Sequence, residues 1–191
     1  MAAVPSRSLL ALACCLSLGL GCSDPASSVP PPADAAVADT AMSLDTNDPY
    51  ATPSMCSSNM HWLLGNHGSI LTHPGGMCIQ CHTSMARGPV FSFAGTLYPS
   101  AHEPDDCYGA DGLNGSEMHI LVTDATGATQ DVLTDQSGNF WSQTAVTFPI
   151  TAVVSHDGRT RAMTTHAPTG DRNACHTESG QTAAPGRIML P

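Results

Sequence analysis

Cys78 and Cys81 are separated by two residues and followed directly by His82, so this segment reads C-x-x-C-H. Two thiols at this spacing can each add to one vinyl group of a porphyrin, and the adjacent imidazole can ligate its iron. In an exported chain the pattern predicts one covalent c-type haem, with His82 as the proximal ligand. The haem would carry the chemistry, while the protein sets axial ligation, burial and solvent access.

Other chemistries use the same residue types. The two thiols could form a disulfide, or bind zinc together with His82. A redox-active thiol pair fits formally, but the flanking residues lack the strand-then-helix pattern of a thioredoxin fold. The chain has no glycine-rich phosphate loop and no nucleophile-elbow sequence. We therefore expect an electron carrier and not a catalyst. A haem enzyme such as a peroxidase would need an exchangeable sixth position and usually a second haem.

A second segment repeats the frame of the first. Pro74–Thr83 and Pro168–Thr177 share the pattern P-x-G-x-(C/R)-x-x-C-H-T, and both lie between glycines and prolines, which predicts loops. Arg172 stands where the first thiol of the second copy would be. Cys175 and His176 could still hold a haem through a single thioether, with Arg172 beside a propionate. We expect instead a vestigial loop and a single haem.

The distal iron ligand is predicted less sharply. The candidates are His102, His67 and Met163. His102 lies in a polar acidic loop that could orient a ligand. The chain around His67, between Asn66 and Gly68, has more freedom to reach the distal side of a haem, and Met163 precedes the second copy of the motif. We rank them in that order, and for each the alternative is a solvated loop side chain. Trp62 and Trp141 are expected to fill the core and not to line a haem edge.

The N-terminus has the features of an export signal. Residues 1–21 carry a basic residue followed by a short apolar run, and Leu18–Cys22 resembles a bacterial lipoprotein processing site, although Gly19 replaces the usual leucine. The resemblance implies acylation of Cys22, a lipid anchor in the cell envelope and, by the residue after Cys22, the outer membrane. Cleavage without acylation would leave a periplasmic protein. Residues 22–54 are rich in Ala, Pro, Ser and Asp and predict a disordered tether.

The charge balance excludes one class of partner. The chain of 191 residues has 16 acidic and six basic residues, all six of them arginines, for a net charge of −10. Nucleic-acid binding is disfavoured because no basic stripe is available to neutralise phosphates. Membrane attachment would then depend on the lipid, and the redox partner protein is not specified by the sequence.

Three cysteines remain after signal, lipid and haem are assigned: Cys56, Cys107 and Cys175. Outside the cytosol two of the three are expected to pair. The sequence does not decide which, but Cys56–Cys107 is preferred because Cys175 belongs to the second copy of the motif.

Between the two motifs the chain reads as a β module. Short β-rich runs bounded by turns predict strands near 90–98, 118–123, 131–134, 140–142, 148–155 and 159–163. We expect a mainly β fold, a small antiparallel β-sandwich over 90–164. It is flanked by a haem-attachment segment over 55–89 and by the degenerate second motif and tail over 165–191.

The segments Gly95–Tyr98, Val122–Gly127 and Leu133–Phe140 resemble the carboxypeptidase regulatory-like modules, which are transthyretin-like β-sandwiches. The resemblance covers about residues 90–155 and implies architecture with little chemistry. Together the features predict an envelope-anchored c-type cytochrome that transfers electrons. The alternative is an anchored β-sandwich binding or scaffold lipoprotein, with its Cys/His loops held by disulfide or zinc and no haem.

Overall fold

The computed structural model describes residues 49–50, 53, 55–113 and 117–191. The predicted signal segment, the predicted acylation site Cys22 and almost all of the predicted tether lie outside these residues. The described part is mainly β, as predicted, with one short α-helix. Its elements are α1 (Cys78–Met85), β1 (Phe93–Tyr98), β2 (His119–Thr123), β3 (Thr129–Leu133), β4 (Asn139–Ser142), β5 (Thr151–His156), β6 (Arg159–Ala162), the 3-10 turn η1 (Arg172–Ala174) and β7 (Ile188–Met189).

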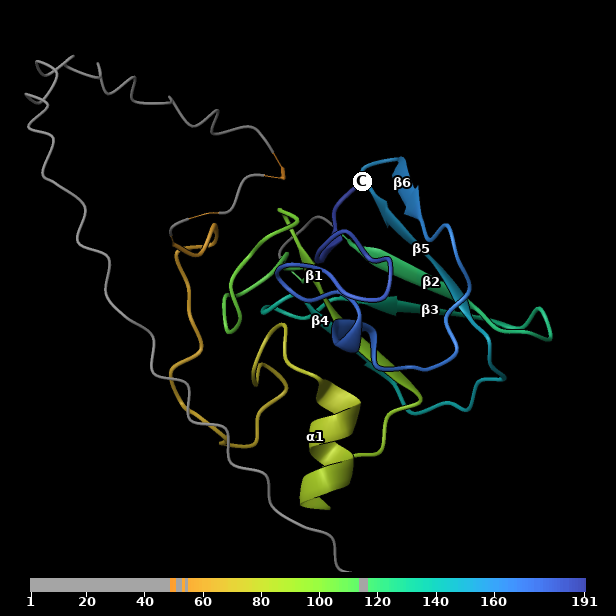
Figure 1. Cartoon of the computed structure of the whole chain (residues 1–191), viewed down its shortest axis with the longest axis horizontal. Coiled ribbons are helices and arrows are strands. Elements are labelled where there is room, and N and C mark those ends of the chain that lie inside the picture. The colour runs from red at the N-terminus through yellow and green to blue at the C-terminus, as the bar shows by residue number, and fades with distance from the viewer. Residues whose placement is uncertain (1–48, 51–52, 54, 114–116) are drawn as a thin grey trace, which may run out of the picture. The chain divides into compact units, whose positions relative to one another are not determined.

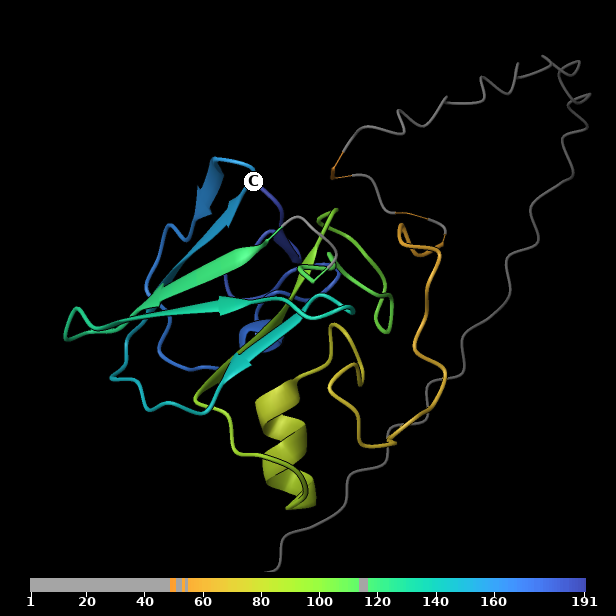
Figure 2. The same ribbon diagram turned by 180° about the vertical axis from the view of Figure 1, so that it is seen from behind.

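The strands form two sheets (Figures 1 and 2). The large sheet has the order β3-β2-β5-β6 and is antiparallel throughout. The small sheet has the order β4-β1-β7, with β4 antiparallel and β7 parallel to β1. Since β7 comes from the tail, residues 165–191 are part of the sandwich and not a separate appendage.

The core lies between the two sheets. Alternate residues of a strand point to opposite faces, so Phe93, Leu97 and Phe140 project inward from the small sheet. Ile120 and Val154, which pair across β2 and β5, project from the large sheet to meet them. This inward face leaves the opposite face of the small sheet for α1 and the loops around it.

Two tight turns, one between β2 and β3 and one between β3 and β4, are stabilised by an aspartate in the same way. Asp124 Oδ1 accepts hydrogen bonds from the amides of Thr126 and Ala128, and Asp135 Oδ1 accepts from the amides of Ser137 and Asn139. An aspartate that bonds its own backbone two and four residues on stabilises a tight turn. These turns lie where the sequence predicted the strand breaks.

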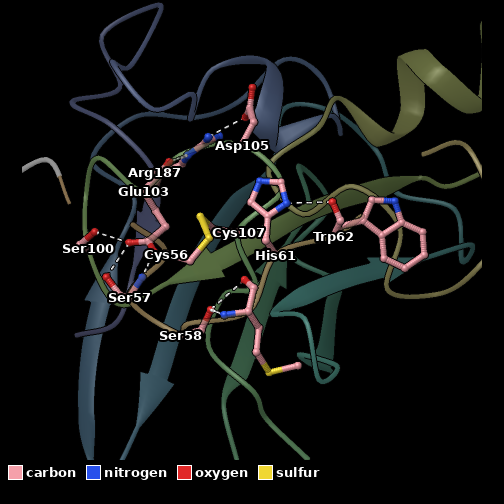
Figure 3. Close-up of a disulfide and its surroundings, with 11 residues drawn as sticks. Cys56, Ser57, Ser58, His61, Trp62, Ser100, Glu103, Asp105, Cys107 and Arg187 are labelled. Carbon is pink, nitrogen blue, oxygen red and sulfur yellow. Dashed lines mark hydrogen bonds and ion pairs between the residues drawn. A yellow bond between two sulfur atoms is a disulfide. The ribbon is translucent and has the colours of Figure 1, made fainter. Parts of the chain in front are cut away.

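A disulfide joins Cys56 to Cys107, the pairing preferred from the sequence (Figure 3). Beside it, the buried carboxylate of Glu103 accepts hydrogen bonds from Ser57 Oγ at 2.9 Å and Ser100 Oγ at 2.7 Å. The segment before the C-x-x-C-H motif is thereby fixed to the loop that follows β1.

Arg187 connects this region to the tail (Figure 3). Its buried guanidinium donates to the carbonyl of Glu103 at 2.8 Å and to Asp105 Oδ1 at 2.6 Å, and it lies 5.2 Å from the ring centre of Tyr98. Because the pairing and the hydrogen bonds satisfy this cation, it can be buried at the edge of the sandwich.

Candidate functional site

The C-x-x-C-H motif forms the first part of a helix. The sequence predicted a loop here, whereas the structure has α1 beginning at Cys78 and continuing for eight residues. Positions i, i+3 and i+4 share one face of a helix, so Cys78, Cys81 and His82 lie on the same side of α1. None of the residues of α1 is buried. The helix therefore presents Cys81 and His82 near the protein surface, whereas the Cys78 thiol is largely shielded from water.

The second copy of the motif holds the first copy in place. Asp171 Oδ2 accepts a hydrogen bond from the Gln80 amide at 2.9 Å, while its Oδ1 is buried without a hydrogen-bond partner. Asn173 Nδ2 donates to the Gly76 carbonyl at 2.8 Å. The first amides of a helix have no partner within it, so Asp171 acts as a cap supplied from more than 90 residues away in the chain. This distance explains why local sequence patterns did not predict the helix.

His82 has one ring nitrogen occupied and one open. Its Nδ1 is 2.8 Å from the Pro89 carbonyl oxygen. A carbonyl can only accept, so Nδ1 carries the proton and the lone pair of the neutral ring is on Nε2. No hydrogen bond to Nε2 occurs among the described residues. Gly88 allows this arrangement, because a Cβ there would lie 2.9 Å from His82 Cε1 and its φ is +78°.

The two thiols of the motif differ in environment. Cys78 Sγ donates to the Gly76 carbonyl at 3.4 Å, and burial raises the pKa of this thiol to about 12, with Asp171 adding to the rise. Cys81 Sγ lies 3.8 Å from Met85 Sδ on the same helix. Both cysteines are reduced. A thiol that stays protonated is a poor redox nucleophile.

Apolar side chains are exposed around the motif. Met77 precedes α1, Met85 is its last residue, and both are exposed, as is Val90 at 83%. The His82 ring packs on Phe91 at 4.8 Å between centroids, and Phe91 packs on Trp141 at 5.2 Å. Such a surface gains free energy if an apolar partner covers it.

The expectation for the two tryptophans was half right. Trp62 is buried, with 5% of its surface exposed, and its indole N–H donates to the Gly65 carbonyl. Trp141 is 39% exposed, so the prediction that it fills the core was wrong. Trp141 pairs with Ala94 on β1, and this pair faces the outer side of the small sheet because the neighbouring Phe140 faces the core.

The three distal-ligand candidates are not brought against His82, since no hydrogen bond or ring contact joins them within the described part of the chain. Met163 packs against the core between the sheets. The His102 ring donates to the Glu178 carbonyl at 2.6 Å, beyond the Tyr98 end of β1. His67 is exposed. Its loop reaches the outer face of the small sheet, where Asn139 Nδ2 donates to the Ile70 carbonyl at 3.3 Å.

Cys175 and His176 lie away from α1. Cys175 is a free thiol directly after η1. The His176 ring donates to the Gly186 carbonyl at 2.9 Å, and burial lowers its pKa, so the ring is neutral at pH 7. Arg172, at the position of the missing thiol, is buried between the sheets.

Asp171, Gly88 and Pro89 contribute to the site and were not predicted from the sequence. Within the described residues no group of three or more His, Cys, Asp and Glu side chains is arranged to hold a metal ion. Nor does any described helix have the length and apolarity to cross a membrane. No protein-family model, no curated protein and no solved structure matches this chain. Its function must therefore be argued from the site.

Proposed function

We propose that this protein is an envelope-anchored c-type cytochrome that binds one covalent haem on α1 and transfers electrons. The observation that carries the proposal is the state of His82. Its Nδ1 is held by the Pro89 carbonyl, its Nε2 is open, and two thiols lie on the same helical face. A metal-ligating histidine characteristically donates its other ring N–H to a carbonyl or carboxylate, which fixes both the tautomer and the ring orientation.

Each residue of the motif has a role. The Cys78 and Cys81 thiols add across one vinyl group each: sulfur bonds to one carbon, the thiol hydrogen goes to the other, and no oxidant is required. His82 Nε2 supplies the proximal ligand. The haem, when bound, supplies one-electron redox chemistry. Asp171 keeps the three side chains in register by capping α1.

The surroundings of α1 fit an apolar group of large area. Met77, Met85 and Val90 are exposed, and Phe91 and Trp141 extend the apolar surface from His82. Lipid attachment at Cys22, an outer-membrane or periplasmic location and an unidentified redox partner protein complete the proposal.

The test is expression of the full chain with c-type maturation proteins. We expect a Soret absorbance that stays with the chain after denaturation, and an intact mass that contains one haem. Replacing both motif thiols, C78A/C81A, should abolish the covalent haem. C175A is the matched control and should retain it, because the second copy of the motif is proposed to hold none.

H82A separates ligation from attachment. The variant should keep the covalent haem but lose the spectroscopic signature of histidine-ligated iron. A colourless matured protein, with or without zinc, would refute the cytochrome and leave the anchored β-sandwich scaffold.

A further inference from the structure

A cavity of about 310 Å³ lies between the two sheets. Its walls are apolar side chains that project inward from both sheets, among them Phe93, Ile120, Val122 and Val154. It extends from this core toward exposed residues after β6, including Thr164 and His166. These four apolar side chains are at most 4% exposed, so most of the open space lies toward the loop after β6 and the tail. A concave site with an apolar inner end suggests a ligand site.

Arg172 brings a positive charge to this cavity. Ala94 on β1 donates to the Gly170 carbonyl at 3.0 Å and pairs with Asp171, so residues 170–172 extend the edge of the small sheet. Successive residues of such a segment point to opposite faces. Asp171 points outward to α1, and Arg172 points inward and lines the cavity.

Gly95 allows the arginine to enter. A Cβ at this position would lie 2.9 Å from Arg172 Cβ and 2.7 Å from Phe140 Cζ. The absence of a side chain on the inner face of β1 at Gly95 therefore provides the room that the arginine stem occupies between the sheets.

The charge of Arg172 is incompletely satisfied. The side chain is 4% exposed, and Nη2 donates to the Thr169 carbonyl at 2.7 Å. The buried Nε has no hydrogen-bond partner, and no carboxylate of the described residues lies within ion-pair distance of the guanidinium. Arginine stays protonated in proteins, and a buried cation with an unpaired N–H is destabilising. An anion in the cavity would remove this cost.

We propose that the cavity binds a medium-chain alkyl carboxylate, with the alkyl chain between the sheets and the carboxylate on Arg172. The volume is about ten times the ~30 Å³ that one water molecule occupies in the liquid, which suits a ligand of about ten non-hydrogen atoms. That is the size of octanoate. Arg161 and Arg187 also line the cavity, but Arg161 is exposed on β6 and the Arg187 guanidinium is paired with Asp105. Since the His176 imidazole is neutral, Arg172 is the buried cation of the lining that lacks a carboxylate partner.

The site is independent of haem attachment, because α1 contacts Asp171 and the cavity is on the other side of the small sheet. It can therefore be tested whether or not the haem is present.

The experiment is titration of the purified full chain with octanoate and, separately, with octanol, followed by calorimetry. We expect one octanoate per chain, and octanol should bind about 10- to 100-fold more weakly, since it lacks the charge that pairs with the guanidinium. R172Q should weaken octanoate binding by the same factor and leave octanol binding unchanged. R159Q, at an exposed arginine of β6 outside the cavity, is the matched control and should bind like the wild type.

A second variant tests the location without altering charge. Ala152 on β5 lines the cavity beside Val122, and A152L would fill part of the space. It should weaken both ligands. The proposal is overturned if octanoate fails to bind the wild type at ~1 mM, or if it binds no more tightly than octanol. Unchanged octanoate binding by A152L would also overturn it. The wild-type comparison of the two ligands decides the point even if R172Q does not fold.

Discussion

Replacement of Asp171 by alanine should lower the local stability of α1 without unfolding the β-sandwich. The helix has eight residues and no buried residue. Isolated helices this short are unstable in water, so α1 depends on contacts from outside. One of these is the Asp171 carboxylate, which accepts a hydrogen bond from the Gln80 amide.

The expected magnitude follows from two opposing effects. Loss of a capping side chain costs ~0.5–2 kcal/mol. A charged acceptor belongs toward the upper end, but burial raises the pKa of Asp171, which shows that ionising this carboxyl in the folded protein has a cost. We therefore expect a loss of ~1–2 kcal/mol in the local stability of α1, equivalent to a 5- to 30-fold increase in its opening.

Amide hydrogen exchange measures this opening directly. The Cys81 amide, which donates to the Met77 carbonyl at 2.9 Å, should exchange 5- to 30-fold faster in D171A, while amides of β2 and β5 keep their rates. D171N retains an acceptor oxygen and should lie between. D131A removes an exposed carboxylate from β3 and serves as the control. Unchanged exchange in α1, or an equal acceleration throughout β2 and β5, would refute the capping role.

Three further predictions concern other parts of the molecule. The double variant C56A/C107A should lose roughly 4 kcal/mol of unfolding free energy in urea, from the closure entropy of a 51-residue separation; a loss below ~1 kcal/mol would contradict this. At pH 8 the Cys78 thiol, with its pKa near 12, should react with iodoacetamide far more slowly than the other thiol of the motif. In carboxyl NMR titrations Asp124 should titrate near pH 2, because hydrogen bonds stabilise its ionised form, and Asp135 above its ordinary pKa, because it is buried. The stabilisation from Asp124 is then present above pH ~3.8 and lost as pH falls toward 2, whereas ionised Asp135 destabilises and protonation relieves this as pH falls.

The strands of the large sheet were predictable because their signals are local. The β-rich runs that became β2 and β5 are bounded by turns, and Asp124 and Asp135 stabilise their turns with hydrogen bonds to residues two and four positions ahead. β7 was not predicted, since a strand of two residues in a glycine-rich tail has no periodicity. Its formation depends on the exposed edge of β1, which the sequence around it does not reveal.

The sequence predicted which residues could bind the haem, but not which residues hold them in position. The spacing of Cys78, Cys81 and His82 places the three side chains together whether the segment is a loop or a helix. The Pro89 carbonyl bonds the His82 ring, and Asp171 bonds the Gln80 amide. Both contacts depend on how the chain folds and cannot be predicted from the motif itself. Trp141 was mispredicted because one face of β4 packs on the core and the other faces outward. The residue type alone does not indicate on which of these faces a tryptophan lies.

The second motif copy explains why the two proposals can fail separately. Asp171 and Arg172 are consecutive, yet the edge of the small sheet sends one side chain to α1 and the other into the cavity. A thiol at position 172 would therefore point between the sheets, into a space of about 310 Å³ that suits a ligand far smaller than a porphyrin. An arginine there is compatible with the sandwich only because Gly95 leaves room for its stem. The second copy thus forms an edge of the small sheet, with Asp171 capping α1 on the outer face and Arg172 lining the cavity on the inner face. The haem proposal and the carboxylate proposal can therefore fail independently.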